Sequence, residues 1–270
     1  MLKNDSIEQS ILPMVRHIVL NITLLQTWYP NAYVNVSLNG VAWYLSATVF
    51  LYFIFPVVLK WIRRKTKNQL ILSTFLLLVF EIICCIFLID FLGKNNPVYI
   101  WFMYCFPVFR AGDFIIGCVL GKVLFTSKKK SCSVWKMTAI ELAVFLITIL
   151  VLICEKIDFN SIILCAIFNW TTVYIPLALS WIVIFVRHEG VLTKMLCNKF
   201  LVFLGDISPY AFLIHYVITQ YSKELMDLGN FTWLKEMRGI IVIGELFVSV
   251  IVSFLYTMIA CNKKIGRKEE

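Results

Sequence analysis

Three ionisable side chains stand inside strongly apolar stretches of the sequence. Glu81 lies between Phe80 and Ile82, and Arg110 and Asp113 share the stretch P-V-F-R-A-G-D-F. A charge at the centre of a membrane helix costs roughly 2.5–3.5 kcal/mol on insertion, so each such residue needs a reason. The i,i+3 spacing lets Arg110 and Asp113 pair on one helix face. Two interpretations stay open: a polar site that lines a water-filled cavity, and a structural ion pair that fixes the helix to a neighbour.

One of the 3 histidines, His215, lies in an apolar stretch, Y-A-F-L-I-H-Y-V-I. Its imidazole could accept a proton, bind a substrate hydroxyl or hydrogen-bond across helices, and periodicity alone favours the structural role. Glu141 and Glu245 lie near the ends of their apolar stretches, where we expect them to reach toward water.

Motifs of other chemistries are missing from the sequence. It contains no H-E-x-x-H, no glycine-rich phosphate loop, no G-x-S-x-G and no pair of close carboxylates suited to glycoside hydrolysis. The 9 cysteines have no C-x-x-C spacing, so we expect neither a metal site nor a disulfide framework.

The composition indicates an integral membrane protein. Of 270 residues, 60% are hydrophobic and 15% charged, and the mean hydropathy is +0.84. A soluble domain is nearer half apolar and a quarter charged. Disordered, collagen-like and coiled-coil chains are excluded by the same numbers. The net charge of +9 raises the question of a nucleic-acid partner, but its distribution indicates membrane orientation instead.

The apolar stretches predict an all-α fold. A spanning helix needs about 20 mostly apolar residues, because the hydrocarbon core is about 30 Å thick and each helical residue rises about 1.5 Å. In lipid the backbone must satisfy its own hydrogen bonds, which favours helices. We therefore expect a polytopic bundle of about eight transmembrane helices in a single membrane domain over residues 1–270, with helices near 11–28, 41–62, 70–92, 99–125, 137–154, 161–186, 200–222 and 239–261.

The basic residues predict the orientation of these helices. Lys and Arg gather in alternate connections, at 60–69, 122–136 and 187–199, and again in the tail at 263–268. Cytoplasmic loops carry such an excess, so we expect both termini to be cytoplasmic and the number of spans to be even. This placement accounts for most of the positive charge without a polyanionic partner, and we expect no nucleic acid to bind.

Three segments together resemble acyltransferase family 3. N-G-V-A-W-Y-L-S-A-T-V-F-L-Y-F-I-F-P (39–56) resembles the family's W-S-L-S-x-E-x-x-F-Y-x-x-F-P. F-P-V-F-R-A-G-D-F-I-I-G-C-V-L-G (106–121) is similar to its F-P-x-F-R-x-x-D-F-x-x-G block, and L-G-D-I-S-P-Y-A-F-L-I-H-Y (204–216) to its late L-G-x-I-S-F-x-x-Y-L-I-H segment. The segments occur in the family's order at family-like separations, and their conjunction is more specific than any one of them.

The resemblance implies a membrane O-acyltransferase. Proteins of this family move an acyl group, commonly acetyl, onto a hydroxyl of a surface carbohydrate. It implies acyl-CoA, most simply acetyl-CoA, as donor substrate on the cytoplasmic side, no bound cofactor, a cell-surface polysaccharide or glycolipid as acceptor, and a bacterial inner membrane as location. Residues that match the family's segments, together with Glu81, are expected to bind substrate or to shape the cavity: Trp43, Ser46, Tyr52, Arg110, Asp113 and Ser208.

The sequence departs from the family's pattern at two places. Thr48 stands where the common motif has Glu. Nothing before residue 39 matches the family's opening L-R-G-x-x-A, the histidine that is its expected general base, or its R-x-x-R, so we expect this chain to begin near the family's fourth helix. His215 is then the best remaining candidate for the base that a sugar hydroxyl needs. The alternative is a non-catalytic multi-pass protein of glycan assembly or export, or an inactive acyltransferase remnant.

Overall fold

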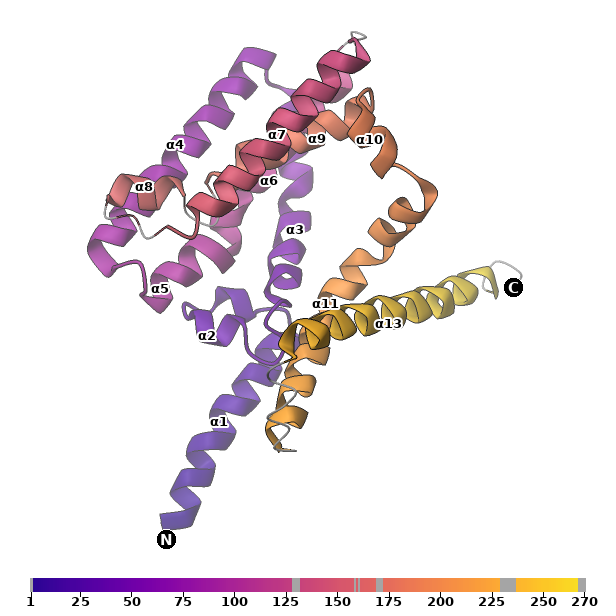
Figure 1. Ribbon diagram of the computed structural model, residues 1–270. Helices are drawn as coiled ribbons and strands as arrows, with labels where there is room; N and C mark the ends of the chain where they lie inside the picture. Colours follow the sequence, from indigo (N-terminus) through magenta and orange to yellow (C-terminus); the bar gives the residue numbers. More distant parts are fainter. Residues whose placement is uncertain are drawn as a thin grey trace. The chain divides into compact units, whose positions relative to one another are not determined.

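The computed structural model describes residues 2–127, 132–157, 159, 161–168, 172–228 and 237–266 (Figure 1). Within these residues every regular element is a helix and no strand occurs, which confirms the all-α prediction. The chain divides into two compact units. The first comprises Met1–Leu38 and Trp43–Met195, and the second Asn39–Ala42 and Leu196–Glu270.

The first unit is built around α6. This helix packs against α3, α4 and α9, while α7 packs against α9. The helices that begin in this unit are α1 (Leu2–Ile22), the 3₁₀-helix η1 (Gln26–Trp28), α2 (Ala32–Asn35), α3 (Trp43–Arg63), α4 (Lys67–Leu92), α5 (Pro97–Ile100), the π-helix η2 (Trp101–Cys105), α6 (Pro107–Thr126), α7 (Val134–Cys154), α8 (Ile162–Ile167), α9 (Tyr174–Arg187) and α10 (Val191–Leu196).

A capping box makes the turn from α3 to α4 sharp. The Thr66 hydroxyl accepts a hydrogen bond from the Gln69 backbone N–H, and the Gln69 side chain accepts one from the Thr66 N–H. These two bonds satisfy backbone donors that a helix start leaves unpaired. Below the turn, Ile62 of α3, Leu70 of α4 and Val119 of α6 form a buried cluster. The two helices therefore form a hairpin whose end packs on α6.

The second unit is a helix pair, α11 (Lys199–Leu228) and α13 (Arg238–Gly266). Phe203 and Phe254 hold their ring centroids 5.8 Å apart, and the Thr219 hydroxyl donates to the Glu245 carboxylate at 3.2 Å. The short segment before α3 belongs here as well, because the Asn39 amide donates to the Leu213 carbonyl of α11.

Five helices of the described residues are long and apolar enough to cross a membrane: α3, α4, α7, α11 and α13. Three of the helix ranges predicted from the sequence differ from the helices in the structure. The first helix ends at Ile22, before a 3₁₀ turn, and the sixth is divided into α8 and α9. The fourth breaks at Phe106, whose ψ of 118° is extended. A residue before proline avoids the helical region and proline suits a first helical position, so Pro107 starts a new helix. Eight spans, cytoplasmic termini and a single domain stay predictions.

Glu141 of α7 corrects an expectation. It does not reach toward water but is fully buried. Its carboxylate accepts hydrogen bonds from the backbone N–H groups of Leu192 and Thr193 and from the Thr193 hydroxyl, at 2.9, 3.3 and 2.6 Å. A glycine at position 190 leaves room for this approach. A buried carboxylate with three donors is satisfied, and it fastens the start of α10 to α7.

We predict that Thr193→Val lowers the free energy of unfolding by about 1 kcal/mol, because one hydrogen bond to the buried carboxylate is lost. Glu141→Ala should cost more, about 1–3 kcal/mol, since two backbone donors are then buried without an acceptor. Denaturant unfolding of the purified protein in detergent, followed by circular dichroism, measures both. The matched control is Thr126→Val, whose hydroxyl donates only within its own helix. Equal effects at positions 193 and 126 would contradict the prediction.

Candidate functional site

A close contact between α4 and α6 organises the site. Glu81 of α4 is 1% exposed, and its Oε1 atom lies 2.8 Å from where a Cβ atom on Gly112 of α6 would stand. Any side chain larger than hydrogen at position 112 would therefore force the carboxylate to move. Neither carboxylate oxygen of Glu81 has a hydrogen-bond donor among the described residues.

An ion pair on α6 lies beside this contact. Arg110 Nη1 is 2.6 Å from Asp113 Oδ2, so the pairing expected from the i,i+3 spacing is present. Arg110 Nη2 donates to the Met103 carbonyl at 2.6 Å. That carbonyl would normally accept from the N–H four residues later, but position 107 is a proline and has none. Pro107 thus leaves an acceptor for Arg110 at the end of η2.

The carboxyl groups of Glu81 and Asp113 lie close enough to interact electrostatically, with Arg110 nearby. We call these three residues the polar centre. This centre has one guanidinium for two carboxyl groups, so the Arg110–Asp113 ion pair balances only one of them. Within the described part of the chain, Asp113 Oδ1 and Arg110 Nε also have no hydrogen-bond partner. The centre therefore contains one carboxyl group more than its ion pair uses, and several of its polar atoms are left without a partner.

The polar centre is partly accessible. The side chains of Arg110 and Asp113 are 13% and 28% exposed, against 1% for Glu81. Asp113 is the most exposed of the three side chains. Among the residues that the structure describes, no three His, Cys, Asp or Glu side chains gather as metal ligands.

The expected residues of α3 differ in their surroundings. The Trp43 ring lies 4.5 Å, centroid to centroid, from that of Tyr104, the neighbour of Met103. Ser46 is buried and its hydroxyl bonds to the Thr27 hydroxyl at 2.6 Å, which ties η1 to α3. Tyr52 is 71% exposed and turns away from the core of the first unit.

The remaining two expected residues belong to the second unit. The Ser208 hydroxyl donates to the Gly205 carbonyl of its own helix at 2.8 Å. The ring of His215 packs on that of Phe212 at 5.4 Å between centroids. Their roles in the site, like those of Trp43, Ser46 and Tyr52, stay predictions.

Sequence reasoning missed three features of the site. Glu81 and Asp113 form a close carboxyl pair, which their positions on two separate helices concealed. The Met103 carbonyl is a backbone group and carries no signal of its own. Gly112 was visible only as one small residue among several, although a glycine directly before Asp113 in a charged segment was a usable signal for a close approach.

We predict that Gly112→Ala destabilises the protein by about 1–3 kcal/mol, because the new methyl group would overlap the Glu81 carboxylate. Gly117→Ala on the same helix is the matched control, since no atom of the described residues lies within 4 Å of its added Cβ. Denaturant unfolding in detergent measures both changes. The double variant Gly112→Ala with Glu81→Ala should recover part of the loss. Equal costs at positions 112 and 117 would show that the two helices do not meet as described.

Comparison with known proteins identifies the family of this chain. The acyltransferase MdmB of Streptomyces mycarofaciens is 22% identical to this chain over an alignment of 269 positions. The alignment covers 93% of this chain and 65% of that protein. The chain thus spans about two thirds of the length of this relative. No solved structure matches. The sequence profile of an acyltransferase domain matches residues 12–259, which begins upstream of the first motif at residue 39 and includes the whole polar centre. The chain belongs to acyltransferase family 3.

Proposed function

We propose that this chain is a membrane-bound O-acyltransferase that moves an acyl group, acetyl in the simplest case, from acyl-CoA to a hydroxyl of a cell-surface polysaccharide or glycolipid. The family match over residues 12–259 and the apolar spanning helices support the reaction class and the membrane. The single observation that carries the proposal is the polar centre: its Arg110 and Asp113 lie in a family-like segment, and Glu81 adds a carboxyl group that their ion pair does not use.

The reaction requires groups of the kind that the polar centre offers. The hydroxyl oxygen attacks the thioester carbonyl, the C–S bond breaks, and the hydroxyl proton is passed on so that the sulfur leaves as a thiol. A carboxylate that takes this proton and a cation that stabilises the negative oxygen each lower the barrier. Glu81 has oxygens without donors, and Arg110 has an N–H without an acceptor in the described part of the chain.

The three residues then divide the work. Asp113 holds the Arg110 guanidinium by an ion pair and thereby positions it. Arg110 faces the developing negative charge with its free Nε–H, and Glu81 accepts the proton, directly or through Asp113. His215 is the second candidate for the base, because it lies in a segment that resembles the family's late motif. The acyl-CoA donor and the carbohydrate acceptor are proposed from the family.

We predict that Arg110→Ala and Glu81→Gln each reduce acyl transfer about 100-fold or more, in the range seen when an enzyme loses an oxyanion donor or a general base. The measurement is transfer of radiolabelled acetyl from acetyl-CoA into carbohydrate, in membranes that contain the whole chain at matched protein levels. Tyr221→Phe, which alters an exposed side chain on α11, serves as a control expected to keep its rate.

The variants also separate the alternatives. If His215→Gln abolishes transfer while Glu81→Gln retains it, the base is the histidine and not the polar centre. If Arg110→Ala and Glu81→Gln both retain full transfer, the centre is structural. Membranes with the unaltered chain that show no donor-dependent transfer would favour the non-catalytic alternative.

A further inference from the structure

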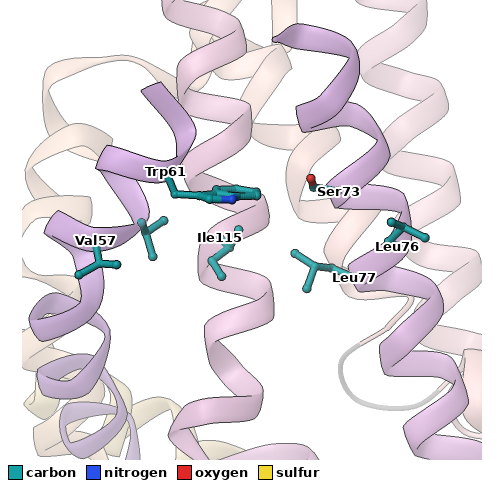
Figure 2. A pocket seen from close by; sticks show the side chains of 7 residues that line it. Val57, Trp61, Ser73, Leu76, Leu77 and Ile115 are labelled. Atoms are coloured by element: carbon teal, nitrogen blue, oxygen red, sulfur yellow. The ribbon is translucent and has the colours of Figure 1, made fainter. Parts of the chain in front are cut away.

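An apolar groove opens on the first unit between α3, α4 and α6. Its volume is about 460 Å³. Figure 2 shows Trp61 of α3 and Leu77 of α4 pointing into the space in front of Ile115 of α6. The hydroxyl of Ser73, which also lines the groove, donates to the Gln69 carbonyl at 2.8 Å. The groove therefore offers hydrocarbon walls and almost no free hydrogen-bonding group.

The groove lies next to the most basic turn of the described chain. Two of its lining residues flank this turn on either side, Trp61 in the last turn of α3 and Ser73 in the second turn of α4. The turn and the helix ends that adjoin it carry five exposed cations: Lys60, Arg63, Arg64, Lys65 and Lys67. Among the residues that the structure describes, no acidic side chain forms an ion pair with any of them.

A molecule that occupies this site must match both the apolar groove and the basic turn beside it. Basic pockets beside membrane helices bind anionic lipid headgroups, and each Lys or Arg near the surface contributes about 1 kcal/mol. With the headgroup phosphate at the turn, the fatty chain of the lipid would extend into the groove. On α3 it would pass from Trp61 to Val57, and on α4 from Ser73 to Leu77, which is one helical turn on each helix. The apolar walls then bury hydrocarbon, which is favourable in proportion to the area buried.

The pantetheine arm of an acyl-CoA fits the same groove less well. Its two amide groups need hydrogen-bond partners, and a polar group buried without a partner costs free energy. The Ser73 hydroxyl already donates its proton to the Gln69 carbonyl, and the indole N–H of Trp61 can serve at most one of the two amides. A saturated or unsaturated fatty chain needs none.

We propose that this groove is a binding site for an anionic phospholipid, with one fatty chain between α3, α4 and α6 and the headgroup phosphate on the basic turn. The site is distinct from the polar centre and does not rest on the proposed acyl transfer. It bears on the centre through α4, because Leu77 in the groove wall lies one helical turn before Glu81.

The fluorescence of Trp61 tests the proposal directly. The whole chain is reconstituted in phosphatidylcholine vesicles that contain a small, fixed fraction of lipid with brominated chains, either phosphatidylglycerol or phosphatidylcholine. The signal of Trp61 is the difference between the unaltered chain and Trp61→Phe. We expect brominated phosphatidylglycerol to quench this signal at a lower fraction than brominated phosphatidylcholine does. Arg64→Gln should weaken that preference about fivefold, which corresponds to about 1 kcal/mol.

Two matched pairs of variants make the result specific. Ser73→Phe fills the groove and should reduce quenching by both lipids, whereas Leu72→Phe adds the same ring at an exposed position outside the lining and should not. Lys136→Gln removes an exposed cation at the start of α7 and should leave the preference unchanged, in contrast to Arg64→Gln.

Three outcomes would overturn the proposal. Equal quenching by the two lipids would mean that the basic turn selects no headgroup. If Ser73→Phe leaves the quenching intact, the brominated fatty chain of the lipid lies outside the groove. Displacement of quenching by a long-chain acyl-CoA, with no preference for phosphatidylglycerol, would assign the groove to the donor substrate instead.

Discussion

The structure of the first unit depends on how a charge is accommodated where two apolar helices meet. α4 carries Glu81 into its contact with α6, and the absence of a side chain at Gly112 allows the approach. Because the region offers few polar groups, each charge must be matched by another residue of the chain. Arg110 balances one carboxylate and the other lies beside it. The packing of α6 on its neighbours is therefore arranged around this one group of side chains.

Glu81 and Glu141 show what distinguishes a structural carboxylate from an available one. Both are buried on apolar helices. Glu141 accepts three hydrogen bonds and joins two elements, whereas Glu81 accepts none from donors in the described residues. A buried acceptor without a donor is costly, so Glu81 needs an explanation that Glu141 does not, and a functional role is one such explanation. The contrast favours a polar site over a purely structural ion pair, the two interpretations that the sequence leaves open.

Hydropathy was enough to predict an all-α membrane fold, because a spanning helix is a long apolar segment. It could not predict where a helix stops inside such a segment. The break at Phe106 follows from the proline after it, a local effect that an average over many residues hides. The Arg110–Asp113 pair was predictable since both residues are on one helix. The approach of Glu81 and the burial of Glu141 were not, because each depends on which helix face meets a distant segment.

The basic turn illustrates how one sequence feature can have two physical causes. Positive residues in a loop orient a membrane protein, and this alone explains why five cations gather at the junction of α3 and α4. Membrane orientation does not explain why α3 and α4 separate enough beyond the turn to leave an apolar groove. A helix pair whose only role was to set the orientation could pack in direct contact there. The groove is bounded by the same stretch of α4 that continues to Glu81. What fills the groove and where Glu81 stands are thus linked through one rigid helix.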